Sequence, residues 1–186
     1  MGCREAVTIL FIRLAASALQ FTNAGTHVPL TPAFQVPQAV FAESGVTVAV
    51  AVSTDEAGRT WVIGTFTPHE PKFHLYSKDL PTTGIRGVGR PTRVDVIPSA
   101  AIALDGPLVA NSPVRRLHVE PLDQELPVYP DGAVTLRQPV RVSVVPSDSV
   151  TLVELSISYM ACSKNLCLPA VVDRHVEIAI PREARR

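Results

Sequence analysis

The sequence predicts an all-β protein with an immunoglobulin-like antiparallel β-sandwich. Short runs of β-branched and apolar residues recur along residues 45–181, with turn-forming residues between them. The chain has 17 prolines and 10 glycines, dispersed as turns between many short strands require. No stretch of about ten residues shows the apolar spacing of a helix. We find no internal repeat, so a single domain is expected.

The predicted strands follow from β-branched content and from two-residue alternation. Residues 150–160 alternate best: Val153, Leu155, Ile157 and Tyr159 share one face, and more polar side chains share the other. Residues 174–180 alternate again and are expected to pair with that strand after a short connection. The full set of expected strands is 46–52, 60–66, 73–77, 92–97, 115–119, 134–145, 150–160 and 174–180.

The amino terminus resembles an export signal. Two apolar stretches, 6–12 and 14–21, follow Arg4 and are separated by Arg13, and small residues suited to cleavage occur near positions 18 and 24. We therefore expect residues 1–25 to be a signal peptide that takes Cys3 with it. A buried N-terminal helix is the alternative interpretation.

The remaining chain divides by composition. Residues 26–44 carry three prolines and are expected to form a lead-in segment or an edge strand. The domain itself is expected at 45–182, followed by a short basic tail at 183–186.

Charge excludes two classes of partner. There are 17 lysines and arginines against 17 aspartates and glutamates, so the formal net charge is zero. Binding to nucleic acid or to an anionic membrane needs concentrated positive charge, which the composition does not supply. No apolar run reaches the roughly 18 residues of a membrane-spanning helix.

Two cysteines define the main candidate site. A hairpin with residues 163–166 as its loop would place Cys162 and Cys167 directly opposite each other, at a spacing that suits a disulfide. Closing so short a loop contributes only about 2 kcal/mol by chain entropy, and short exposed disulfides are often the ones that exchange. Once Cys3 is removed, the even count fits an oxidising compartment. A structural staple in a secreted β-protein would look the same, so both interpretations stand.

Three segments resemble the N-terminal periplasmic domain of the thiol:disulfide interchange protein DsbD. The most specific is Tyr-Met-Ala-Cys-Ser-Lys-Asn-Leu-Cys-Leu-Pro at 159–169, which is similar to the family's active-site hairpin. Phe-His-Leu-Tyr-Ser-Lys at 73–78 resembles its aromatic strand, and 126–136 resembles the segment after its cap loop. The resemblance covers roughly residues 45–181.

The resemblance implies an immunoglobulin-like domain with a reversible disulfide that passes electrons to periplasmic partners. Cys167 would form the mixed disulfide and Cys162 would resolve it. A cap loop at about 118–125, with Leu122 over the sulfurs, would shield the pair. The family's membrane and thioredoxin-like domains have no counterpart here, so a thioredoxin-like or membrane-embedded redox donor is expected in trans. The acceptor would be a periplasmic protein that carries a disulfide.

Residues near the cysteines have a functional and a structural interpretation each. Tyr76 and Tyr159 are expected to pack beside the sulfurs or to serve as ordinary sandwich aromatics. Lys164 could favour a thiolate or be solvated, and Pro169 would fix the chain that leaves the loop. His74 could accept a proton from a thiol or be a structural core histidine. The apolar residues Met160, Leu166 and Leu168 would form a docking rim or part of the core.

The preferred function is thiol–disulfide exchange in the periplasm or another exported location, with no cofactor and no metal. Such activity would be of the protein-disulfide reductase kind; cytochrome c biogenesis is one possible pathway. A non-enzymatic exported binding module with a structural disulfide is the alternative. A copper(I) site from Met160, the two cysteines and a histidine (His69, His74 or His175) is a third hypothesis. Hydrolase and phosphate-loop motifs are absent from the sequence.

Overall fold

The computed structural model describes residues 37–119, 123–143 and 150–181, and all the regular structure in them is β. This confirms the predicted all-β immunoglobulin-like class. Among the described residues there is no helix long and apolar enough to cross a membrane. The strands are β1 Ala39–Glu43, β2 Val46–Thr54, β3 Thr60–Pro68, β4 His74–Leu75, β5 Arg93–Val96, β6 Ile102–Leu104, β7 Val109–Ala110, β8 Arg115–Val119, β9 Gln124–Val128, β10 Val134–Val142, β11 Val150–Tyr159, β12 Ala161–Cys162 and β13 Val171–Pro181.

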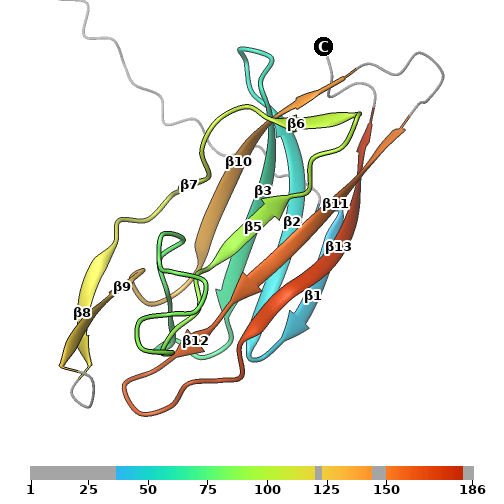
Figure 1. The fold of residues 1–186 in the computed structure, drawn as a ribbon. Helices are drawn as coiled ribbons and strands as arrows, with labels where there is room; N and C mark the ends of the chain where they lie inside the picture. Colours follow the sequence, from blue (N-terminus) through green and yellow to red (C-terminus); the bar gives the residue numbers. More distant parts are fainter. Residues whose placement is uncertain (1–36, 120–122, 144–149, 182–186) are drawn as a thin grey trace, which may run out of the picture. The chain divides into compact units, whose positions relative to one another are not determined.

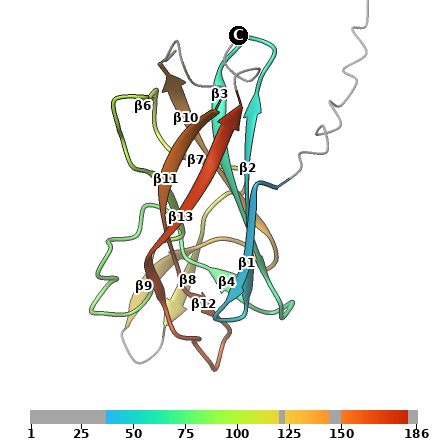
Figure 2. The same cartoon turned by 90° about the vertical axis from the view of Figure 1, so that its right-hand side faces the viewer.

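Two sheets form the sandwich. The larger has the order β1-β2-β3-β10-β6, with β7 also paired to β10, and the smaller has the order β13-β11-β5. Figure 2 shows the smaller sheet facing the larger one. All pairings within these sheets are antiparallel, and two additional two-stranded sheets join β12 to β4 and β8 to β9.

Alternating side chains build the main core between the sheets. On β11, Val153, Leu155, Ile157 and Tyr159 are at most 1% exposed, whereas Leu152 on the other face is 61% exposed, as the alternation predicts. The predicted partner strand is also present, because β13 pairs with β11 along most of its length. The valines of β2 at 46, 48 and 50 complete the same core from the facing sheet.

The segment expected as a lead-in or edge strand contains β1. Ser44 and Gly45 both have positive φ, 46° and 69°, which is the backbone of a two-residue hairpin turn. This turn sends the chain from β1 into β2, and β1 becomes the edge of the larger sheet. The predicted signal peptide at 1–25 and the tail at 183–186 lie outside the described residues.

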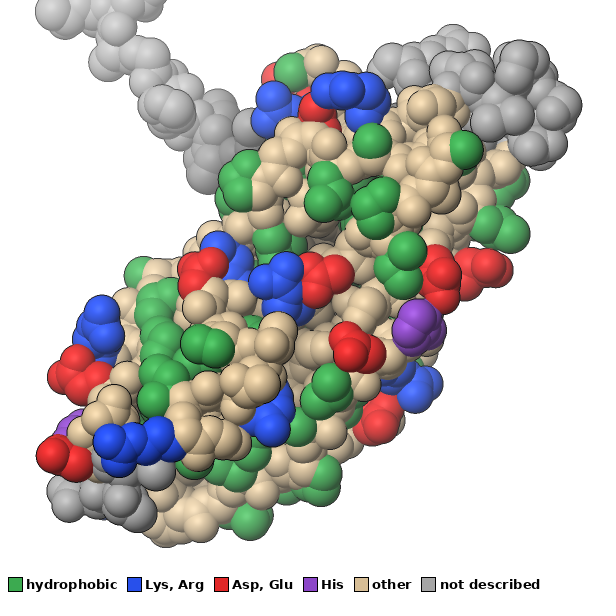
Figure 3. All heavy atoms as spheres, viewed as in Figure 1, with side chains coloured by type: hydrophobic (Ala, Val, Ile, Leu, Met, Phe, Trp, Pro, Cys, Tyr) green, Lys and Arg blue, Asp and Glu red, His purple; other side chains and the backbone are tan. Residues whose placement is uncertain are grey.

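Charges of both signs alternate on the surface. On the face drawn in Figure 3, lysine and arginine side chains lie beside aspartate and glutamate. Three ion pairs illustrate this pattern: Arg93 with Asp95, Arg115 with Asp131, and Arg141 with Asp105. The drawn face therefore presents no concentrated field of one sign.

One end of the sandwich carries the segments that the candidate site needs. The short sheet of β12 and β4 lies there, together with the β8–β9 hairpin and the loop of residues 77–91 (Figures 1 and 2). A bridge from Tyr76 to Val128 joins the end of β4 to β9, so these pieces form one small assembly beside the main core.

Candidate functional site

Cys162 and Cys167 form a disulfide at the tip of the hairpin that follows β11. The S–S distance is 2.03 Å, and the two Cα atoms lie 4.0 Å apart. Backbone hydrogen bonds flank the pair on both sides, from Ser163 N to Leu166 O at 2.7 Å and from Leu168 N to Ala161 O at 2.9 Å. The cysteines are therefore a non-hydrogen-bonded opposed pair, the kind in which Cα atoms approach most closely. The predicted opposition of the two residues is confirmed.

Ser163 organises the four-residue loop between the cysteines. Its Oγ accepts hydrogen bonds from Asn165 N at 3.4 Å and from Leu166 N at 3.2 Å. A serine hydroxyl that accepts from backbone amides two and three residues later stabilises such a turn. Sequence reasoning did not single out Ser163, although a serine at the first loop position is the signal that could have done so.

The two cysteines differ in exposure to solvent. Cys162 is 2% exposed and packs in a hydrophobic cluster, whereas Cys167 is exposed. The neighbours of Cys167 are also exposed: Lys164 and Pro169 face solvent, and Leu166 is 57% exposed. An incoming thiolate can thus reach Cys167, while Cys162 is shielded by protein.

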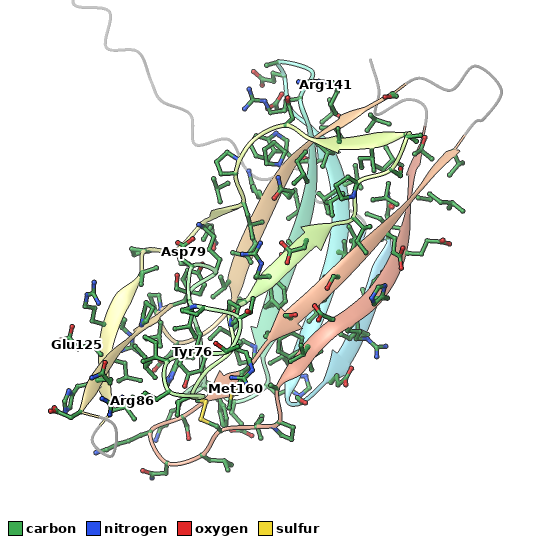
Figure 4. The ribbon with its side chains drawn as sticks, viewed as in Figure 1. Tyr76, Asp79, Arg86, Glu125, Arg141 and Met160 are labelled. Carbon is green, nitrogen blue, oxygen red and sulfur yellow. A yellow bond between two sulfur atoms is a disulfide. The ribbon has the colours of Figure 1, made fainter. Side chains whose placement is uncertain are left out.

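A second hydrophobic cluster, separate from the main core, surrounds Cys162. Figure 4 shows Tyr76 and Met160 beside the disulfide. The cluster draws on the end of β4, the 77–91 loop, the β8–β9 hairpin and β12. Its buried members are Tyr76, Leu80, Leu126, Val128 and Cys162, and Ile85, Val88, Leu117, Val119 and Met160 pack against them.

Tyr76 contacts the buried sulfur directly. Its hydroxyl donates a hydrogen bond to Cys162 Sγ at 3.3 Å, and the side chain is only 2% exposed. Burial raises the pKa of the Tyr76 hydroxyl, so it remains a protonated donor at neutral pH. A donor in this position would stabilise negative charge on Cys162 when the disulfide opens.

The 77–91 loop holds Tyr76 in place from the other side. The Arg90 guanidinium donates to the backbone carbonyls of Thr83, Gly87 and Gly89, at 3.0, 3.1 and 2.6 Å. Gly89 has φ +81°, and a Cβ atom there would lie 2.9 Å from the Tyr76 ring. Glycine therefore allows the loop backbone to approach the ring closely. The glycines at 84, 87 and 89 were a signal for this loop that sequence reasoning did not use.

Tyr159 belongs to the main core. Its hydroxyl donates to the Glu43 carbonyl at 2.9 Å, and its ring meets Phe66 edge-on with centroids 5.7 Å apart. Burial, together with the charge of Glu43 and partly offset by Arg174, raises the pKa of Tyr159 to about 12. Leu122, the expected cap residue, lies outside the described residues. The described ends of its segment, 118–119 and 123–125, belong to the β8–β9 hairpin.

The histidines are distributed over different surroundings. His74 is 4% exposed and lies opposite Cys162 in the β4–β12 register. His69 pairs with the Thr47 hydroxyl, and His175 pairs with Glu154. Within residues 37–119, 123–143 and 150–181, no group of three or more His, Cys, Asp or Glu side chains is placed to hold a metal ion.

These features define a class: an all-β sandwich domain with a disulfide hairpin whose two cysteines are unequally exposed. No family model and no curated protein sequence matches the chain. Among solved structures, the reduced DsbD N-terminal domain of Neisseria meningitidis is similar, with a TM-score of 0.47 and 16% identity over 75% of this chain and 86% of that one. The N-terminal periplasmic domain of ScsB from Proteus mirabilis is similar with a TM-score of 0.47 and 10% identity. That match covers 80% of this chain and about half, 52%, of the ScsB chain.

The DsbD N-terminal domain, which the sequence motifs resemble, is thus among the solved structures similar to this chain. At these identities the likeness concerns the fold, and any function has to be argued from the cysteine hairpin itself.

Proposed function

We propose that the chain catalyses thiol–disulfide exchange through Cys162 and Cys167. The observation that carries the proposal is the unequal burial of the two cysteines: Cys167 is exposed, and Cys162 is buried with a hydroxyl donor against its sulfur. A disulfide that only staples a hairpin has no need of this asymmetry. An exchanging pair does, because it has to present one sulfur to partners and to retain the other for resolution.

The reduction of the domain would proceed in two displacements. A donor thiolate attacks Cys167 Sγ, a bond forms between donor and Cys167, and the bond to Cys162 breaks with its electron pair on Cys162 Sγ. The Tyr76 hydroxyl stabilises the charge on this leaving sulfur. A second donor thiol then attacks the donor sulfur of the mixed disulfide, which releases the oxidised donor and a reduced domain.

The transfer of electrons to an acceptor is the reverse sequence. The Cys167 thiolate attacks an acceptor disulfide and forms a mixed disulfide, and one acceptor sulfur leaves. Cys162 then attacks Cys167 Sγ, which re-forms the intramolecular disulfide and releases the second acceptor sulfur. The exposed positions of Lys164, Leu166 and Pro169 around Cys167 would make them the first residues that a partner meets.

The partners and location follow from this chemistry. A disulfide that cycles needs a reductant, which we propose to be a thioredoxin-like or membrane-embedded donor in trans, and a disulfide-bearing acceptor protein. The N-terminal apolar segment and the disulfide itself support an exported, periplasmic location. We propose that the segment between β8 and β9 is a cap that shields the cysteine pair, with Leu122 as the residue over the sulfurs.

The reduction potential of the pair tests the proposal. The protein would be equilibrated in graded thiol buffers, quenched by alkylation and weighed by mass spectrometry. We expect a value of about −180 to −270 mV, the range of exchanging proteins. A value below about −300 mV would mark a bond that physiological thiols do not reduce, and the structural-staple interpretation would replace exchange.

Trapping variants separate the two cysteine roles. Cys162→Ala is expected to accumulate mixed disulfides on Cys167, because the resolving thiol is missing. Cys167→Ala is expected to form none, because its remaining thiol is buried. Equal trapping by both variants would contradict the assigned roles. Non-reducing gels of the two reduced variants after incubation with an oxidised model protein would provide the measurement.

A further inference from the structure

His74 lies opposite the buried cysteine in a strand pair. Its register partner across the β4–β12 pair is Cys162, and directly opposed residues of antiparallel strands point to the same face. Tyr76 lies two residues further on and shares that face. The His74 and Tyr76 rings meet edge-on with centroids 5.8 Å apart, and the Tyr76 hydroxyl contacts Cys162 Sγ. Three side chains capable of hydrogen bonding thus converge on one face of a two-stranded sheet.

The His74 ring has an unmatched polar atom. Only 4% of the residue is exposed, and Nε2 has no hydrogen-bond partner. The one other buried side-chain atom in this condition among the described residues is Thr92 Oγ1. Buried polar atoms without a partner are uncommon in native proteins, and a redox or catalytic role is one of the explanations for such an atom. For His74, the reduced state of the cysteines would supply a thiol as donor.

The surroundings of His74 favour the neutral ring. Burial lowers the pKa of His74 most, Arg115 on β8 lowers it further, and Asp131 after β9 raises it in part. Arg115 and Asp131 also pair with each other, with their charged atoms 2.5 Å apart. From β12 the facing titratable group is Cys162. Near neutral pH the imidazole therefore has one nitrogen with a free lone pair, which can accept a proton.

We propose that His74 accepts the proton of the Cys162 thiol in the step that resolves the mixed disulfide. The inference rests on the exchange function proposed above. Cys162 S–H gives its proton to the imidazole, and its sulfur attacks Cys167 Sγ. The bond between Cys167 and the partner sulfur breaks, and the partner leaves as a thiolate with that electron pair. The imidazolium then returns the proton to the departing thiolate or to water.

The step needs a base because Cys162 is buried. Burial in apolar surroundings disfavours a thiolate, so few Cys162 thiols would ionise unaided at neutral pH. The Tyr76 hydroxyl is a donor and can stabilise the thiolate, but it cannot take the proton from the thiol at this pH, because burial raises its pKa. Among the groups on this face, only His74 combines burial, a neutral state and an unpartnered nitrogen.

A small aromatic disulfide, dithiobis-nitrobenzoate, distinguishes the reactions of the two thiols in one experiment. The reduced protein is mixed with the reagent, and the coloured nitrothiobenzoate is followed in time. In the first phase Cys167 attacks the reagent, one nitrothiobenzoate leaves and the other stays on Cys167. In the second phase Cys162 attacks Cys167 Sγ and releases the remaining nitrothiobenzoate. The first phase tests the exposed thiol, and the second tests the proposed role of His74.

We expect His74→Gln to slow the second phase by roughly 100-fold at neutral pH, as the loss of a general base does, and to leave the first phase unchanged. The pH profile provides a second readout. The wild-type second phase should decline only below the His74 pKa, which lies under its usual value. In the variant, the rate should still be rising with pH above neutrality, as the unaided Cys162 thiol ionises.

Two further variants keep the result interpretable. His69→Gln changes an exposed histidine that pairs with Thr47 and should alter neither phase. His74→Phe retains an aromatic ring against Tyr76 without a base, and it should behave as His74→Gln does. A urea titration shows whether each His74 variant is folded before urea is added. If one of them is not folded, the other is used. A second phase that keeps its wild-type rate and pH profile in a folded His74 variant would overturn the inference and leave exchange intact. Failure of the exchange function would show separately, as a reduction potential below about −300 mV for the wild-type cysteine pair.

Discussion

The two hydrophobic clusters of this domain differ in their composition and in how they are assembled. The main core consists mostly of aliphatic side chains, with a few aromatic ones, and most of it comes from long paired strands. The hydroxyls of its tyrosines have backbone partners, such as the Glu43 carbonyl for Tyr159. The second cluster is small, comes from two-residue strands, a hairpin and a loop, and places a sulfur against a hydroxyl. His74, whose Nε2 has no hydrogen-bond partner, lies opposite Cys162 in the register of β4 and β12.

This difference indicates a division of tasks within one domain. The larger cluster buries enough apolar surface to hold the sandwich together. The smaller cluster keeps Cys162 out of solvent while its disulfide partner remains accessible. Changes in the first should therefore act on stability, and changes in the second should act on the reactivity of the cysteines.

Truncation in each cluster gives the largest expected effect. Ile157 and Leu126 are both fully buried, the first in the main core and the second beside Cys162. Ile157→Ala should lower the free energy of unfolding by about 2–5 kcal/mol through a cavity, as measured by urea titration. Leu126→Ala should also lower stability through a cavity, and it should in addition speed the alkylation of Cys162 in the reduced protein. If Ile157→Ala under native conditions speeds this alkylation equally, the clusters are one unit.

Two glycines of the 77–91 loop form a matched pair for the next effect. Gly87 and Gly89 have φ of +83° and +81°, but an added Cβ would meet nothing within 4 Å at Gly87 and the Tyr76 ring at Gly89. Both alanine variants should lose about 1–3 kcal/mol of stability through the positive φ. Gly89→Ala should lose more and should also change Cys162 alkylation. Equal results would mean that the Gly89 approach to Tyr76 has no consequence.

Removal of the disulfide should have a smaller effect than core truncation. The loop it closes is short, with a sequence separation of 5, so chain entropy predicts about 2 kcal/mol or less for Cys162→Ala with Cys167→Ala. The main core should keep its cooperative urea transition. A loss above about 4 kcal/mol would exceed what such a loop contributes and would favour a structural staple.

The pH dependence of stability should show the smallest effect. Because the pKa of Tyr159 rises from 10.0 to about 12 on folding, its contribution is present below about pH 10 and is lost as the pH rises through about 12. Tyr159→Phe should lower stability by roughly 0.5–1.5 kcal/mol at neutral pH, through the lost bond to Glu43. It should also flatten the alkaline decline. Urea titrations at neutral and alkaline pH provide the measurement, and an unchanged alkaline slope would contradict the assignment.

The main core could be predicted from sequence because its signal is local. Two-residue alternation along β11 identified the buried positions 153, 155, 157 and 159, and the same pattern identified β13 as the partner strand. Strands β6, β7, β9 and β12 were not predicted as such. Three of them have only two or three residues, which is too short for a two-residue alternation to be recognised, and β9 contains a proline.

The cysteine opposition was predictable for a similar reason, since a four-residue loop leaves little choice of register. The surroundings of Cys162 were harder to predict from the sequence. The pairing of His74 with Cys162 depends on a strand of two residues, and the approach of Gly89 to Tyr76 depends on a loop with positive φ at several positions. Such geometry is set by tertiary contacts between distant segments, which a single sequence does not display.

The backbone hydrogen bonds on either side of the cysteine pair have a kinetic consequence. The bonds Ser163 N to Leu166 O and Leu168 N to Ala161 O do not involve sulfur, so they can persist when the disulfide opens. The two thiols would then stay at a high effective concentration relative to each other, of the kind that makes intramolecular reactions outpace intermolecular ones. A covalent complex with a partner should consequently be short-lived in the wild-type protein, and this lifetime limits how long a bound partner can occupy the domain.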